Sequence, residues 1–176
     1  WLAEELGYAP LYLRYNSGMS IVHNGRELSN KLDQLVKSWP VPVEELVILG
    51  HSMGGLVGRS ACHQAELNDL SWLKSLHKLV CLGSPHHGTV LERGGHWLDS
   101  ALALSPYSAP FARIGKRRSA GITDLRHGSI TDGEHEFVPL PKDVMCFALA
   151  ATLGSRRDVL SERLIGDGLV PLNSAL

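Results

Sequence analysis

The 176-residue chain is long enough for one domain with a sizeable core and too short for two typical domains. Its 17 Lys and Arg residues nearly balance 18 Asp and Glu residues, and the formal net charge of -1 argues against nucleic acid or an anionic membrane surface as the partner. No apolar stretch approaches the roughly 20 residues that a transmembrane helix needs, and no signal peptide is visible. A small-molecule or neutral lipid partner fits this balance better.

The apolar runs and helical patterns alternate along the chain, beginning with a run of strand length at Ala9–Tyr15. A helical face over residues 24–39 ends at Pro40, because proline cannot continue a helix. Buried strands are then predicted at 44–50, 77–83 and 143–152, and a helix at 53–67. Parallel strands need crossovers long enough to hold a helix. The chain is therefore predicted to be an α/β protein with a doubly wound, mainly parallel sheet and helices on both faces.

The three cysteines are widely spaced and lie among apolar or small residues: Cys62, Cys81 and Cys146. An odd number at such spacing indicates buried free thiols rather than a disulfide framework or a metal site. Free thiols favour a reducing compartment such as the cytoplasm. No metal site is predicted from these residues.

Ligands of doubly wound sheets bind beyond the carboxyl ends of the strands. The motif of this chain that most specifically indicates a function lies at such a strand end. The segment "GHSMG", Gly50–Gly54, follows a predicted strand and opens a predicted helix, which is the context of a G-x-S-x-G nucleophile turn. We expect Ser52 to be the nucleophile and the Met53 N–H to donate to the oxyanion. His51 lies on the turn itself and is predicted to pack beside the site rather than act as the base.

The segments "VILGHSMGGLVGRSA", "LVCLGSPHHGT" and "IGDGLVPLNSAL" occur in this order along the chain. Together they resemble the α/β-hydrolase superfamily, and in particular lipases and relatives of the GPI inositol deacylases. The resemblance implies esterase or lipase chemistry without a metal or organic cofactor, with Asp167 as the triad acid. His86 and His87 are candidate residues at the mouth of the site.

In this superfamily the triad residues follow the chain order serine, acid, histidine. The nine residues after Asp167 contain no histidine, and no strand that could carry a second oxyanion donor is visible before Trp1. We therefore interpret the chain as an α/β-hydrolase domain that is incomplete at both ends. The catalytic histidine is expected roughly 15 to 40 positions beyond Leu176, after another strand.

An insertion is predicted at about 88–130, within the single domain 1–176. It includes the apolar stretch "HWLDSALALSPYSAPFARIG" at 96–115, which fits a helical cap over the site. An apolar cap facing the cleft would favour acyl chains, whereas the same residues could equally pack the cap onto the core. Both interpretations stay open at the level of the sequence.

Three functions are compatible with these motifs. The first is a serine hydrolase that cleaves carboxylic esters, of hydrophobic or lipid-like substrates, through an acyl-serine intermediate. The second keeps the same nucleophile but transfers the acyl group or cleaves a thioester. The third is a non-catalytic module of this fold that binds a hydrophobic ligand or a protein.

Overall fold

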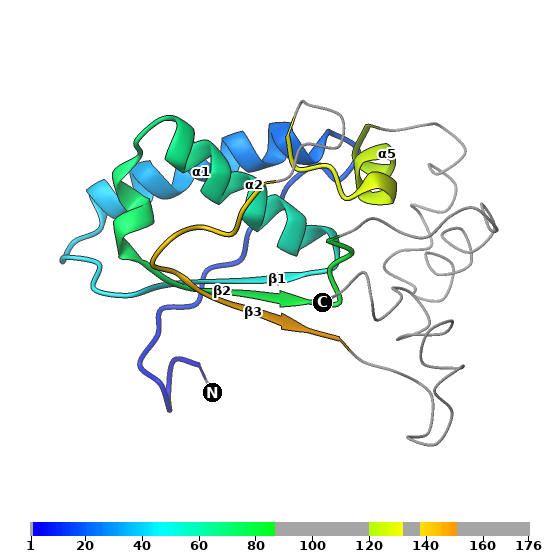
Figure 1. Cartoon of the computed structure of the whole chain (residues 1–176). Helices are drawn as coiled ribbons and strands as arrows, with labels where there is room; N and C mark the ends of the chain where they lie inside the picture. The colour runs from blue at the N-terminus through cyan, green and yellow to red at the C-terminus, as the bar shows by residue number, and fades with distance from the viewer. Residues whose placement is uncertain (1, 87–119, 132–137, 151–176) are drawn as a thin grey trace, which may run out of the picture.

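The computed structural model of the chain describes residues 2–86, 120–131 and 138–150. A parallel sheet with the order β1-β2-β3 lies at its centre (Figure 1). Its strands are β1 (Leu46–His51), β2 (Leu76–Leu82) and β3 (Met145–Leu149). The predicted α/β class with a parallel sheet is thereby confirmed.

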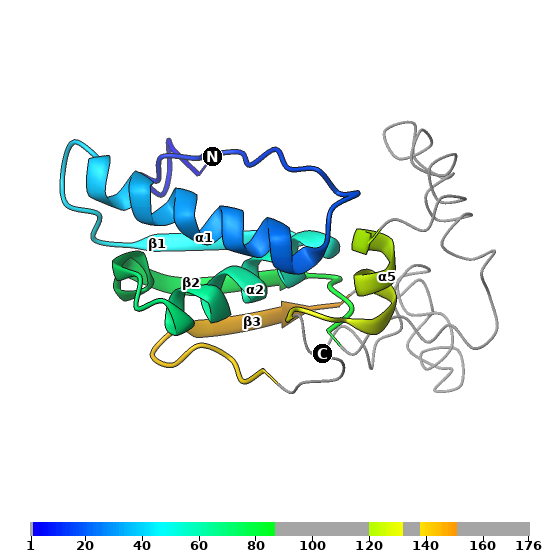
Figure 2. The same ribbon diagram turned by 90° about the horizontal axis from the view of Figure 1, so that it is seen from above.

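The helices of the described residues lie on one face of the sheet (Figures 1 and 2). They are α1 (Ile21–Ser38), α2 (Met53–Leu67) and α5 (Ala120–His127), together with the short 3-10 helix η1 (Ser71–Ser75). The predicted helix at 53–67 has the bounds of α2, and the predicted helix at 24–39 corresponds to α1. None of these helices is long and apolar enough to cross a membrane.

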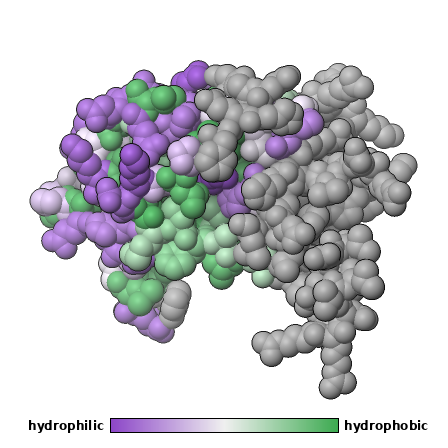
Figure 3. Space-filling model, in the orientation of Figure 1, coloured by the Kyte–Doolittle hydropathy of each residue, from purple (hydrophilic) through white to green (hydrophobic). Residues whose placement is uncertain are grey.

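The strand register separates a packed face of the sheet from an open one. Leu79 pairs with Ile48 and Cys146 on the side of the helices, where Leu79 belongs to the main core cluster. One residue further along, Val80 pairs with Leu49 and Phe147, whose side chains point the other way because successive side chains alternate. Leu49 and Phe147 are exposed. In Figure 3, apolar residues gather at the level of the sheet and hydrophilic residues dominate the side of α1.

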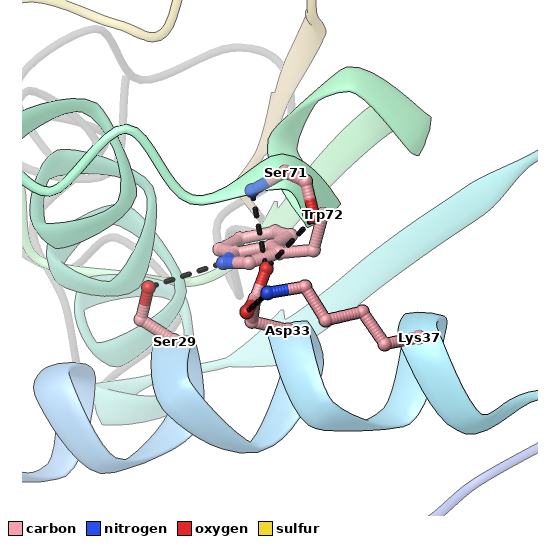
Figure 4. A network of polar contacts seen from close by, with 5 residues as sticks. All are labelled: Ser29, Asp33, Lys37, Ser71 and Trp72. Carbon is pink, nitrogen blue, oxygen red and sulfur yellow. Dashed lines mark hydrogen bonds and ion pairs between the residues drawn. The ribbon is translucent and has the colours of Figure 1, made fainter.

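Among the described residues, Trp72 is the largest fully buried side chain, and it connects η1 to α1. Its indole Nε1–H donates to Ser29 Oγ at 3.1 Å, so the polar end of the ring is satisfied within the core. One helical turn further along α1, Asp33 accepts hydrogen bonds from the backbone N–H and the hydroxyl of Ser71 and from Lys37 (Figure 4). The hydrogen bond from Lys37, with those from Ser71, holds the pKa of the Asp33 carboxyl below its usual range.

The N-terminal end of α1 is fixed from two sides. Ser20 accepts a hydrogen bond from the His23 N–H at 3.0 Å, which is a side-chain cap of the first turn. Asp124 of α5 accepts from the Ile21 N–H at 2.8 Å, across 103 residues of sequence. A carboxylate at this end of a helix is favourable because the N-terminus carries partial positive charge. Helix α5 is therefore docked on the start of α1.

The strand predicted at Ala9–Tyr15 is wrong, because residues 7–16 belong to no strand in the structure. This segment passes around the free edge of β1, from the level below the sheet toward the start of α1 (Figures 1 and 2). Its apolar side chains gave a strand pattern, but it forms no hydrogen-bonded ladder with β1. The pattern alone does not supply a partner strand.

The thiols of Cys62 and Cys81 are free and buried, and that of Cys146 is free and half-buried. Burial raises the pKa of Cys62 to about 12 and that of Cys81 to about 11. Both side chains are therefore protonated thiols at neutral pH and pack as small apolar groups.

Candidate active site

Ser52 occupies a strained turn between the end of β1 and the start of α2. Its backbone has φ 53° and ψ -123°, a conformation that is rare for a residue with a side chain. The Ser52 N–H donates to the Leu82 carbonyl at 2.9 Å, which ties the turn to the carboxyl end of β2. The Ser52 side chain makes no capping hydrogen bond to α2. Its hydroxyl is therefore not used to stabilise the helix that it begins.

Two glycines of the turn allow the backbone and its neighbours to approach closely. A Cβ on Gly50 would lie 2.5 Å from the Gly55 nitrogen, where the end of β1 meets the first turn of α2. A Cβ on Gly55 would lie 2.1 Å from Ser84 Oγ, in the loop after β2. Real Cβ atoms do not approach other atoms so closely, so this packing requires glycine at both positions.

Met53 is the first residue of α2, where backbone N–H groups have no partner within the helix. Its side chain packs against a core cluster formed by Ile21, Leu56, Val57, Ile130 and Val138, as does Leu125 of α5. The helix end and α5 are thus held by the same apolar contacts. This packing holds in place the helix start that carries the Met53 N–H, the predicted oxyanion donor.

His51 is the last residue of β1 and is exposed. It pairs in register with Leu82 and follows the alternation that places Leu49 on the open face of the sheet. The structure therefore places the His51 side chain on the face opposite to α2. His51 neighbours Ser52 in sequence, but it lies on the other side of the strand.

His86, in the loop after β2, is held by Arg59 of α2. The Arg59 guanidinium donates from one nitrogen to His86 Nδ1 at 3.1 Å and from the other to the Val138 carbonyl at 2.9 Å. Burial lowers the pKa of Arg59, and its buried Nε has no hydrogen-bond partner among the described residues. Arg59 thus joins α2, the loop after β2 and the chain segment that precedes β3.

The contact with Arg59 also defines the protonation of His86. Guanidinium groups donate hydrogen bonds and cannot accept them, so His86 Nδ1 must be the acceptor and the neutral ring carries its proton on Nε2. A triad histidine needs the opposite arrangement, with Nδ1–H donating to a carboxylate and Nε2 free to take the proton of the serine. This geometry argues against His86 as the base of Ser52.

The sequence interpretation did not assign a role to Arg59. The available signal was a single charged residue within the otherwise apolar and small stretch from Leu56 to Cys62 on α2. Such a residue is buried only when its donors find acceptors. Those acceptors come from His86 and Val138, which are distant in sequence and could not be paired with Arg59 from the pattern alone.

Asp167 and His87 lie outside the described residues, as does most of the predicted cap at 88–130. The end of that predicted insertion is described: α5 packs on α1, and Ser60 Oγ of α2 donates to the Ile130 carbonyl at 2.8 Å. Within residues 2–86, 120–131 and 138–150, no group of three His, Cys, Asp or Glu side chains could hold a metal ion.

The chain was compared with known families and structures. The family model described as "PGAP1-like alpha/beta domain" matches residues 22–147, whereas no curated protein matches. Among solved structures, the chain is similar to the Bacillus licheniformis lipase BlEst2. The propeptide form has 23% identity and a TM-score of 0.48 over 78% of this chain. The mature form has 18% identity and a TM-score of 0.45 over 77% of this chain.

The matched region spans 28% of the propeptide form and 51% of the mature form, so this chain corresponds to only part of those proteins. The family match, in contrast, covers most of the chain, including the Ser52 turn and all three strands except the end of β3. The chain belongs to the PGAP1-like alpha/beta domain family.

Proposed function

We propose that the protein is a serine hydrolase that cleaves carboxylic esters, with Ser52 as the nucleophile. The observation that carries this proposal is the backbone of Ser52, whose positive φ is strained for any residue other than glycine. Such strain costs of order 1–3 kcal/mol and persists where the surrounding fold enforces it, commonly at functional sites. A serine with only a structural role in this turn would be better replaced by glycine.

In the proposed reaction, Ser52 Oγ attacks the acyl carbonyl carbon and its proton passes to a histidine base. The Met53 N–H donates to the oxygen that becomes negative. The tetrahedral intermediate collapses, the histidine gives its proton to the departing alcohol, and an acyl-serine ester remains. Water, activated by the same histidine, then releases the acid and restores the Ser52 hydroxyl. Asp167 would orient the histidine.

The proposed substrates are hydrophobic or lipid-like esters. Two observations support this class: the apolar composition of residues 96–115 in the predicted cap, and the similarity in fold to proteins described as lipases. An apolar wall near the nucleophile binds acyl chains by removing their surface from water.

A fluorophosphonate probe on the full-length protein tests the nucleophile. We expect covalent labelling that is lost in Ser52→Ala, because the probe reacts with activated serine hydroxyls. Ser38→Ala is the matched control: it removes an exposed hydroxyl at the far end of α1 and is expected to leave the labelling unchanged. Absence of labelling, or labelling that persists in Ser52→Ala, would contradict the proposal that Ser52 is the nucleophile and would favour a non-catalytic binding module.

The substrate class is tested on the same protein with p-nitrophenyl esters of short and long acyl chains. A hydrophobic acyl site predicts a higher kcat/KM for the longer chains. Activity confined to the acetate would contradict the lipid-like substrate while leaving the ester hydrolase proposal intact.

A further inference from the structure

Tyr15 lies beside the first turn of α2, although it comes from the segment before α1. Its hydroxyl is 3.9 Å from the position that a Cβ would take on Gly54, which follows the predicted oxyanion donor Met53 in the chain. This distance is an ordinary van der Waals contact, so the missing side chain of Gly54 leaves the hydroxyl facing the backbone of the helix start. No assignment from the sequence motifs includes this residue.

The Tyr15 hydroxyl makes no hydrogen bond with the part of the chain that the structure describes. The residue is 37% exposed, so part of its side chain is accessible to a ligand. Burial raises the pKa of Tyr15, which keeps the phenol protonated and able to donate at neutral pH. Partly buried tyrosine hydroxyls usually find a hydrogen-bond partner. Among the described residues, the Tyr15 hydroxyl therefore remains available to a bound substrate.

The chain that directly follows Tyr15 is held rigidly. The Asn16 side chain accepts from the Gly18 N–H at 2.9 Å, and the Asn16 carbonyl accepts from the buried Asn24 side chain at 2.9 Å. Helix α5 closes on the same turn: a Cβ on Gly121 would lie 2.4 Å from the carbonyl oxygens of Ser17 and Met19. The position of Tyr15 is thus fixed from α1 and from α5, as a group that acts by orientation requires.

We propose that Tyr15 is a catalytic residue of the Ser52 site, whose phenol donates a hydrogen bond to the acyl oxygen as negative charge develops there. The inference rests on the proposed ester hydrolase function. Tyr15 would act with the Met53 N–H as a second, side-chain donor to the oxyanion. It remains protonated throughout, so no bond to its oxygen is made or broken.

The test is Tyr15→Phe in the full-length protein, which removes only the hydroxyl. Loss of one oxyanion donor lowers kcat by about 100-fold or more, whereas KM changes little because the bond strengthens in the transition state. The rate of fluorophosphonate labelling should fall as well, because the tetrahedral phosphorus adduct places an oxygen where the oxyanion forms. Short p-nitrophenyl esters are the substrate, to keep contacts with the acyl chain out of the comparison.

Tyr12→Phe is the matched control. Tyr12 lies on the same segment and is 90% exposed, so loss of its hydroxyl is expected to leave kcat, KM and labelling unchanged. Thermal unfolding should be unchanged in both variants. A Tyr15→Phe protein that unfolds at lower temperature would show a structural partner for the hydroxyl and overturn the proposal.

Two further outcomes are distinguishable. Wild-type kcat in Tyr15→Phe, or a rise in KM alone, would overturn the role of Tyr15 while Ser52-dependent labelling upheld the hydrolase. If the wild-type protein itself is not labelled, the hydrolase proposal fails and the role of Tyr15 fails with it.

Discussion

At the scale of single residues, the position of Ser52 depends on how closely two pieces of backbone meet. A Cβ on Gly50 would lie 2.5 Å from the Gly55 nitrogen and 2.6 Å from the Gly54 carbonyl carbon. These are backbone atoms of α2, so relief of the contact requires movement of the helix start itself. The same helix start carries Met53, and its displacement would alter both the Ser52 turn and the proposed oxyanion donor.

Gly50→Ala is therefore expected to destabilise the protein by about 1–3 kcal/mol, as overpacking does, and to slow fluorophosphonate labelling of Ser52. Denaturant unfolding and the labelling rate are the two measurements. Gly58→Ala is the control, because its Cβ would meet only side-chain atoms of Leu79 and Ile48, at 3.2 and 3.3 Å. Equal behaviour of the two variants would contradict the importance of backbone contact at Gly50.

At the scale of elements, α1 is the helix to which distant parts of the chain are attached. Its start is capped by Ser20 and by Asp124 of α5, and its middle is bound to η1 through Trp72 and Asp33. The stabilisation that Trp72 contributes to the contact between α1 and η1 comes from burial and does not vary with pH. The stabilisation that Asp33 contributes does vary with pH, because its carboxylate accepts hydrogen bonds from Lys37 and from Ser71 (Figure 4).

Asp33→Asn is expected to lower the free energy of unfolding at neutral pH by up to about 1 kcal/mol, since solvent screens part of the ion pair. The folded-state pKa of Asp33 is lowered from 3.8, so the stabilisation is present above that value and is lost as the pH falls through the folded-state pKa. The difference between wild type and variant should thus shrink below about pH 4. Urea unfolding between pH 7 and pH 3 measures it. A difference that is constant over this range would contradict the carboxylate's role.

The prediction of these elements from the sequence was uneven for physical reasons. The bounds of α2 were predicted because a buried strand, a glycine turn and a helical pattern adjoin within one short stretch. The start of α1 was predicted at 24 rather than Ile21, because one of its caps is supplied by Asp124 from 103 residues away. The false strand at Ala9–Tyr15 has the apolar composition of a strand but no ladder to join.

The candidate site was predictable to the same limited extent. Ser52 and Met53 follow from local order along the chain, and their turn has the strained backbone expected of a nucleophile. The contacts of Arg59 and the proposed role of Tyr15 depend on segments that only the folded chain brings together. Asp167 stays a prediction from the sequence.

At the scale of the whole molecule, the sheet has one packed face and one open face within the described residues. Leu79 on the packed side is 1% exposed, and Leu49, on the neighbouring strand but the open side, is 61% exposed. The same residue type thus occurs in two environments of one sheet. Comparing substitutions at Leu79 and Leu49 therefore measures how much the helix layer contributes to the free energy of unfolding.

Leu79→Ala is expected to lower the free energy of unfolding by about 2–5 kcal/mol, because it leaves a cavity between the sheet and the helices. Leu49→Ala is expected to cost about 1 kcal/mol or less, because its side chain is already largely hydrated. Chemical denaturation of both variants provides the measurement. Similar losses would mean that the open face is covered in solution.

The hydrogen bond between Arg59 and His86 and the docking of α5 on α1 affect which parts of the sequence can change in length. Strand β2 ends at Leu82 and is followed by His86, which Arg59 holds. Helix α5 is fixed to the start of α1 by Asp124. Closure of a loop between fixed ends becomes harder only slowly with length, by about 0.6 kcal/mol for each doubling. The length of sequence between His86 and Ala120 is therefore expected to vary among relatives at little cost to these two attachments. If Ser52 is the nucleophile, as proposed, substrate preference could then diverge without any change in the proposed reaction.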